Sequence, residues 1–153
     1  MRILVTVGTT QFDELIKHVD VNIKNKDITF QIASGTYIPM NYKYFTFTDN
    51  FNKKIEDSDI IITHSGAGSV YSFLEMKKKI IVVPNLERVD KHQRELAKYI
   101  EENDFAYVAW DLNQIDTLLN KIETKEFRKY EKIDFFKTVE IKNIINELIV
   151  STF

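Results

Sequence analysis

DIIITHSGAGSVYSF, residues 59–73, decides the fold class. It begins with an apolar run of strand length, which is typical of a strand buried in a parallel sheet. Two glycines and several small or hydroxyl-bearing residues follow, and the pattern then becomes helical. A strand, a glycine-rich turn and a helix in this order predict one unit of an α/β domain with a parallel sheet.

The same alternation of strand and helix extends along the chain, with no linker and no internal repeat. Thr10 and Asp13 form a capping signal at the start of the first helix. Together the elements predict a single Rossmann-like α/β domain over residues 1–153, with a parallel sheet flanked by helices. Strands are expected at residues 3–7, 28–33, 44–47, 59–63, 79–84 and 105–110, and helices at 12–23, 50–57, 69–76, 90–102, 112–122 and 134–149.

Composition excludes several classes of protein. The chain has 153 residues, 44% hydrophobic and 29% charged, which is typical of a globular protein and not of a disordered one. A formal net charge of −2 provides no basic field, so no nucleic-acid partner is expected. The absence of cysteine fits a reducing compartment, and no apolar stretch approaches the roughly 18 residues of a membrane span. We therefore expect a cytoplasmic protein.

Each of the four glycines follows a predicted strand, where an open parallel sheet binds its ligands. Glycine lets the backbone approach a ligand, and the N–H groups at the start of the next helix attract an anion. Two such loops could grip one diphosphate, although small residues could also simply close the turns. The candidate residues are Gly8, Thr9, Thr10, Ser65, Gly66, Ala67, Gly68 and Ser69.

Polar residues next to these loops are further candidates. His64 directly precedes the second glycine loop, where it could act as a base or phosphate donor, or as a structural residue bonded to backbone. Asp90, His92 and Gln93 fall near the start of a helix and could hydrogen-bond a sugar, or could form a helix cap and solvated surface. The dispersed histidines predict no metal site.

Three other features are interpreted as structural. His18 is expected on the outer surface of the first helix, and residues 77–79, three lysines, are expected to form a solvated turn after a helix. The aromatic residues at 42–47 are expected to belong to the core and the sheet, and not to a base-stacking platform.

Gly66-x-Gly68 also forms half of a dinucleotide-binding fingerprint. Glu87 lies where a ribose-binding acid would belong, near the end of the next strand. Tyr71, however, occupies the third glycine position and would obstruct close packing of helix on strand. An NAD(P)-binding module is therefore an alternative that Glu87 favours and Tyr71 opposes.

The stretches MRILVTVGTTQFDELI (residues 1–16) and THSGAGSVYSFLEMKKKIIVVPNLERVDKHQRELA (residues 63–97) resemble the C-terminal domain of glycosyltransferase family 28. More narrowly, the chain resembles the small single-domain subunits of this family that act in dolichol-linked glycan synthesis and in bacterial capsule and exopolysaccharide synthesis. The resemblance implies half of a GT-B enzyme, which binds a UDP-sugar donor and joins a membrane-anchored partner that carries the acceptor half. The implied reaction is an inverting, metal-independent sugar transfer to a lipid-pyrophosphate-linked acceptor, without a cofactor, at the cytosolic membrane face.

The resemblance also implies roles for individual residues. A glutamate that commonly binds the uridine ribose in this family is replaced by Ser72, and Glu75 lies one turn further on. Either residue substitutes, or the donor site is altered, which would favour a non-catalytic accessory subunit. The residues implied to contact the donor are Gly8 and Thr9 in the first loop, residues 65–69 at the diphosphate, and Asp90, His92 and Gln93 at the sugar.

No carboxylate–histidine pair is evident for deprotonating the acceptor. The base is therefore expected from the partner, and His64 is the local candidate. The apolar stripe at residues 141–149 is expected either to contact the partner or to cover the sheet.

Overall fold

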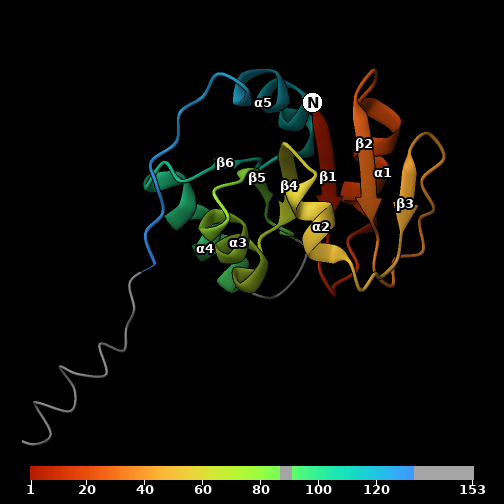
Figure 1. The fold of residues 1–153 in the computed structure, drawn as a ribbon, viewed down its shortest axis with the longest axis horizontal. Coiled ribbons are helices and arrows are strands. Elements are labelled where there is room, and N and C mark those ends of the chain that lie inside the picture. Colours follow the sequence, from red (N-terminus) through yellow and green to blue (C-terminus); the bar gives the residue numbers. More distant parts are fainter. Residues whose placement is uncertain (87–90, 133–153) are drawn as a thin grey trace, which may run out of the picture.

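The computed structural model describes residues 1–86 and 91–132, and its centre is a six-stranded parallel sheet (Figure 1). The strand order is β3-β2-β1-β4-β5-β6, so the first strand lies inside the sheet. The strands are β1 (Arg2–Thr6), β2 (Asp27–Gln31), β3 (Lys43–Phe45), β4 (Ile60–His64), β5 (Lys79–Val83) and β6 (Tyr107–Val108).

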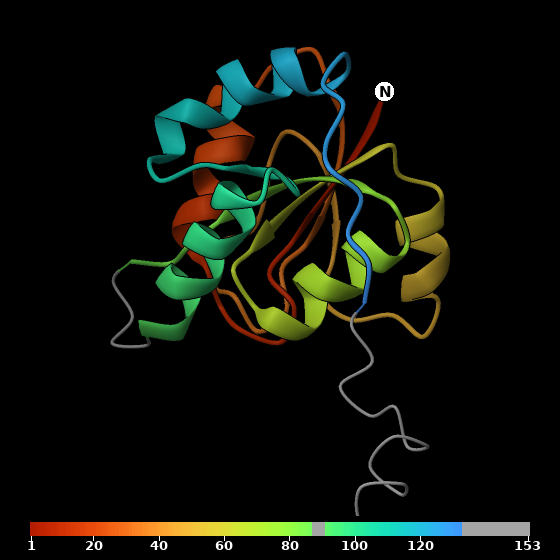
Figure 2. The ribbon, with the colours of Figure 1, turned by 90° about the vertical axis from the view of Figure 1, so that its left-hand side faces the viewer.

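Helices cover both faces of this sheet, and each buries an apolar stripe against it. On one face, α1 and α5 pack on alternate strand residues such as Ile62. On the other face, α2, α3 and α4 pack on the intervening residues such as Ile61. Figure 2 shows α1 and α5 on one side and α2 and α3 on the other. The helices are α1 (Asp13–Asn22), α2 (Phe51–Glu56), α3 (Ala67–Glu75), α4 (Lys91–Glu102) and α5 (Ile115–Ile122), with a 3₁₀ turn (Leu112–Gln114) before α5.

The strand order reverses between β1 and β4, which are hydrogen-bonded neighbours. The chain leaves β1 towards α1 on one face and leaves β4 towards α3 on the other. Such a reversal opens a crevice at the carboxyl ends of the two strands. The predicted fold class, a Rossmann-like parallel sheet flanked by helices, is confirmed, and the two glycine loops meet at this reversal.

Some predicted details differ from the structure. The capping signal at Thr10 and Asp13 is wrong, because α1 begins after Phe12 without a side-chain cap. The Asp13 carboxylate instead accepts hydrogen bonds from the backbone N–H and the hydroxyl of Thr36 in the loop after β2. The outer strands β3 and β6 have three and two residues and are shorter than predicted. Glu87, Asp90 and the helix expected at 134–149 lie outside the described residues.

The lysines at 77–79 do more than form a solvated turn. The Lys78 ammonium donates to the carbonyl of Glu56, the last residue of α2, at 2.9 Å and to the carbonyl of Ser58, two residues later, at 2.8 Å. The Lys79 ammonium donates to two carbonyls at the end of α5, at 2.7 and 3.1 Å. These cations satisfy carbonyl groups that a helix end leaves without an intrahelical donor.

None of the helices in residues 1–86 and 91–132 has the length and apolar character to cross a membrane.

Asp20 on α1 holds the loop between β2 and β3. Its side chain is fully buried and accepts hydrogen bonds from the Tyr37 hydroxyl at 2.8 Å and from the backbone N–H groups of Met40 and Asn41 at 2.9 and 3.0 Å. Burial by itself raises the pKa of this carboxyl, but the hydrogen bonds outweigh it and hold the pKa below its ordinary value. The ionised carboxylate therefore stabilises the folded loop.

We expect Asp20→Asn to lower the free energy of unfolding at pH 7 by about 1–3 kcal/mol, because the amide turns a donor towards donors. The lowered pKa in the folded state means that the carboxylate contributes fully above the unfolded pKa of about 3.9. This contribution is lost as the pH falls through the folded pKa. Urea unfolding of both proteins between pH 7 and pH 3 should show the difference shrinking below about pH 4. A difference that stays constant would contradict this assignment.

Candidate functional site

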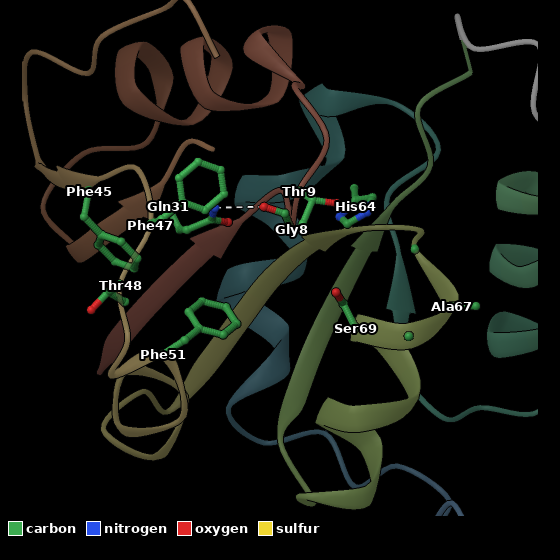
Figure 3. Close-up of a pocket in the computed structure, with 12 residues that line it drawn as sticks. Gly8, Thr9, Gln31, Phe45, Phe47, Thr48, Phe51, His64, Ala67 and Ser69 are labelled. Carbon is green, nitrogen blue, oxygen red and sulfur yellow. Dashed lines mark hydrogen bonds between the residues drawn. The ribbon is translucent and has the colours of Figure 1, made fainter. Parts of the chain in front are cut away.

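A pocket of about 520 Å³ opens at the carboxyl ends of the central strands, where the strand order reverses (Figure 3). One wall is formed by the two glycine loops, and the opposite wall by the segment that follows β3 and by the start of α2. The lining residues are Gly8, Thr9, Gln31, Phe45, Phe47, Thr48, Phe51, His64, Gly66, Ala67, Gly68 and Ser69.

Most of the residues predicted to bind a diphosphate meet in this pocket, although Thr10 and Ser65 do not line it. The backbone N–H of Thr10 closes a turn onto the Val7 carbonyl at 3.2 Å. Ser65 is buried, and its hydroxyl donates to the Gln93 carbonyl at 2.6 Å. Ser65 therefore fixes the glycine loop to α4.

Helix α3 begins in the pocket wall with geometry that suits an anion. Gly66 is its N-cap residue in an extended conformation, and no side chain in the described residues caps the helix. The first N–H groups of a helix have no intrahelical partner, and the positive end of the helix dipole lies beside them. Ala67, Gly68 and Ser69, the first three residues of α3, all line the pocket. The helix start can therefore hold a phosphate group.

The imidazole of His64 lies between the two glycine loops (Figure 3). A Cβ atom on Gly8 would lie 2.8 Å from its Cε1 atom, and a Cβ atom on Gly66 would overlap its Nε2 atom. Gly8 also has a φ of +63°, which side chains other than glycine rarely adopt. A Cβ atom on Gly68 would have no neighbour within 4 Å. Gly8 and Gly66 are therefore required by the packing of the ring, whereas Gly68 leaves space open.

Aromatic side chains form the opposite wall of the pocket. Phe45, Phe47 and Phe51 line it, and Phe47 is 63% exposed. The interpretation of the aromatic run as core and sheet is therefore wrong for Phe47, which follows the end of β3. The signal that could have found it is the same positional rule that located the glycines, because Phe47 also follows a strand at the carboxyl edge.

Charged groups are scarce around this pocket. Within the described part of the chain, the lining residues include no Asp, Glu, Lys or Arg, and His64 is the titratable side chain among them. An anion in the pocket would be held by backbone and hydroxyl donors. No group of three His, Cys, Asp or Glu side chains that could hold a metal ion is found in residues 1–86 and 91–132.

A sequence model described as the glycosyltransferase family 28 C-terminal domain matches residues 2–148. The chain belongs to this family.

Curated relatives of this family 28 domain carry the name UDP-N-acetylglucosamine transferase subunit ALG13. The Mus musculus protein is 34% identical over 116 residues, which cover 66% of this chain and 10% of the relative. The Saccharomyces cerevisiae protein is 37% identical over 115 residues, which cover 66% of this chain and 57% of the relative. The chain thus spans about a tenth of the mammalian protein and over half of the yeast protein.

Two solved structures have the same fold as this family 28 domain. A solution structure of ALG13 superposes with a TM-score of 0.61 at 20% identity, covering 86% of this chain and 89% of that one. Acinetobacter baumannii MurG superposes with a TM-score of 0.60 at 18% identity, covering 80% of this chain and 41% of that one. The superposition covers less than half of the MurG chain, so the fold of this domain corresponds to a part of that protein.

The positions implied for the ribose of a donor lie on α3, and neither lines the pocket. Ser72 is exposed one turn beyond Ser69, which does line it. Glu75 is the last residue of α3, and its carboxylate lies 3.4 Å from the Lys132 ammonium. Because residues three apart share a helix face, Ser72 is better placed than Glu75 to extend the site.

The residues implied for a donor sugar lie on α4. Gln93 is buried, and its side-chain oxygen accepts a hydrogen bond from the Asn85 backbone N–H at 3.2 Å. Gln93 therefore ties α4 to the chain after β5. His92 is exposed, with its Nδ1 atom 3.8 Å from the Glu95 carboxylate. Neither residue lines the pocket, and Asp90 lies outside the described residues.

The pattern of the first helix predicts His18 on the outer surface, but its side chain is partly covered in the structure. It is half-buried and lines a second, smaller hollow of about 330 Å³ together with Trp110 and Asp111. Burial lowers the pKa of His18, and the nearby Asp111 carboxylate partly opposes this effect.

Alanine substitutions should separate the two glycines of the second loop. We expect Gly66→Ala to lower the free energy of unfolding by about 1–3 kcal/mol, because its Cβ atom overlaps the His64 ring. Gly68→Ala, which meets open space, should change it by less than about 1 kcal/mol. Urea denaturation measures both. His64→Ala should reduce the effect of Gly66→Ala, and equal losses at both glycines would contradict the packing argument.

Proposed function

We propose that this chain is the donor-binding subunit of a two-component glycosyltransferase, which transfers a sugar from a UDP-sugar to a lipid-linked acceptor. The observation that carries the proposal is the pocket at the strand reversal, which combines an uncapped helix start with an aromatic wall. Relatives named UDP-N-acetylglucosamine transferase subunit support UDP-N-acetylglucosamine as the donor to test first.

The two walls of the pocket match the two ends of a nucleoside diphosphate. The diphosphate would accept hydrogen bonds from the start of α3 and from the loop at Gly8 and Thr9. The base would lie against the exposed ring of Phe47, because aromatic rings stack on base faces. The sugar would extend towards α4, where Asp90, His92 and Gln93 are proposed to contact it.

Catalysis by such a site would depend on stabilising the leaving nucleotide. Negative charge would develop on the departing diphosphate, and the N–H groups at the start of α3 would stabilise that charge if the diphosphate binds there, as we propose. A base must also remove the proton of the acceptor hydroxyl. Since no carboxylate lines the described part of the pocket, we propose that a membrane-anchored partner supplies this base, with His64 as the local alternative. That partner would bind the acceptor and bring the chain to the cytosolic membrane face.

A non-catalytic accessory subunit is the second candidate. Ser72 replaces the implied ribose-binding acid, and the nearest carboxylate further along α3, that of Glu75, is paired with Lys132. Without a carboxylate to accept hydrogen bonds from the ribose, the affinity for a donor nucleotide would be low, as expected for a subunit that has lost donor binding. Direct measurement of nucleotide binding separates the two candidates.

Gly68→Val should abolish UDP binding and leave the fold intact, because Gly68 lines the pocket and its new side chain would enter open space. Ligand-observed NMR of the purified chain with UDP, UDP-N-acetylglucosamine and NAD measures this directly. We expect UDP and the UDP-sugar to bind the wild type and neither to bind the variant at matched concentrations.

A matched control is Thr117→Val, which introduces the same side chain at an exposed position of α5 away from the pocket. This variant should bind UDP like the wild type. Binding of NAD without UDP would contradict the proposal in favour of a dinucleotide-binding module. Absence of binding by both the isolated chain and its complex with the partner would favour the accessory subunit.

Ser72 and Glu75 can be compared in the same titration. Ser72→Ala should weaken UDP binding by about twofold to tenfold, the equivalent of one hydrogen bond. Glu75→Gln should leave the affinity unchanged, because it alters a surface pair with Lys132. The reverse ranking would transfer the proposed ribose contact to Glu75.

A further inference from the structure

Gln31, the last residue of β2, has an unusual environment for a strand residue. It is only 4% exposed, yet it lines the pocket. Its side-chain oxygen accepts hydrogen bonds from the Thr6 hydroxyl at 2.6 Å and from the Val7 backbone N–H at 3.2 Å. Its side-chain nitrogen donates to the carbonyls of Gly8 at 2.8 Å and Thr46 at 3.0 Å. All four hydrogen-bonding positions of the amide are therefore occupied.

The two carbonyl partners belong to opposite walls of the pocket. Gly8 is part of the first glycine loop, and Figure 3 shows the bond that links it to Gln31. Thr46 directly precedes Phe47 in the aromatic wall. The pairing of β2 with β3 ends at Gln31 and Phe45, so the Gln31 side chain continues the connection where the sheet ladder stops.

We propose that Gln31 is a positioning residue, which fixes the distance between the phosphate-binding loop and the aromatic wall. The ligand side of this inference rests on the proposed function, because a nucleotide would span both walls. A single amide group suits the task, since its oxygen accepts from Thr6 and Val7 at the end of β1 and its nitrogen donates to the two carbonyls. A carboxylate would place an oxygen against these carbonyls, and an apolar side chain would leave all four groups without their partner.

Two near-isosteric substitutions test the proposal with UDP as the probe. Gln31→Met removes all four hydrogen bonds, and we expect it to weaken UDP binding about tenfold or more. Gln31→Glu keeps the acceptor side but loses both donors when it is ionised. Protonation would restore one donor, and burial among carbonyl oxygens raises the pKa of such a carboxyl group.

The affinity of Gln31→Glu for UDP should therefore be low at pH 8 and recover as the pH falls to 5, relative to wild type. Dividing the affinity of the variant by that of wild type at each pH removes the effects of protonating the nucleotide or His64, which both proteins share. His64 is the titratable side chain in the described pocket lining. An ionised carboxylate in the pocket lining would also repel the diphosphate, so the pH-dependent ratio supports the positioning role only together with weak binding by Gln31→Met, which carries no charge. A ratio that is flat, or that falls with decreasing pH, would overturn the proposal.

Loss of stability must be separated from loss of positioning. Ile122→Val in α5 removes one methylene from a fully buried side chain outside the pocket lining, with an expected cost of about 0.5–1.5 kcal/mol. This control should bind UDP like wild type. A Gln31→Met protein that is folded and binds UDP with wild-type affinity would overturn the proposal.

The amide NMR spectrum of the free protein gives an independent readout. Gln31→Met should shift the signals of Gly8 and Phe47, on the two walls, and leave the signal of Thr117 in α5 in place. If wild type fails to bind UDP, the proposed function fails, but these signals still decide the positioning role. Unchanged Gly8 and Phe47 signals would overturn it.

Discussion

The parallel pairing of β1 with β4 is the constraint on which the rest of the structure depends. Residues Ile3 to Thr6 lie opposite Ile60 to Thr63, and the chain leaves the two strands towards opposite faces of the sheet. The two following loops must therefore diverge, and a crevice opens between them. The ring of His64 packs between these loops, against Gly8 in one and Gly66 in the other, and so limits how closely the loops can approach.

The proposed site works with dipoles where many phosphate sites use charges. Backbone N–H groups, hydroxyl groups, one amide side chain and the imidazole of His64 provide the polar surface of the described pocket. Such groups attract an anion only weakly unless they are already oriented, because reorienting them costs the free energy that binding would release. The hydrogen bonds of Gln31 and the bond from Ser65 to the Gln93 carbonyl are therefore as relevant to ligand binding as the groups that face the ligand.

Local patterns were enough to predict the fold and most residues of the pocket wall that we propose binds phosphate. The apolar strand at 59–63, the glycines after it and the helix that follows are neighbours in the sequence, and their geometry depends mainly on one another. Predictions failed where a side chain has a distant partner. The pattern assigns Asp13 to a helix cap, but its carboxylate accepts a hydrogen bond from Thr36 in the loop after β2. The aromatic pattern assigns Phe47 to the core, but β3 ends two residues earlier and leaves the Phe47 side chain exposed.

Gln31 is a residue that the sequence patterns did not identify at all, for the same reason. Its partners Thr6 and Thr46 lie 25 and 15 residues away, so no sequence window contains the network. The pattern of β2 identifies it as one polar residue in a strand. Only the strand order brings its amide between two loops, and therefore its contribution to the pocket could not be predicted from periodicity or motif spacing.

The strands are shorter at the two edges of the sheet than at its centre. The central strands β1 and β4 have five residues each, whereas β3 has three and β6 has two. A short edge offers few unpaired N–H and C=O groups to a strand from another molecule, which limits edge-to-edge aggregation. A domain that folds before it joins a partner, as proposed for this chain, would benefit from this arrangement. Its most apolar strands are enclosed by neighbours on both sides, and its two border strands offer few residues for further pairing.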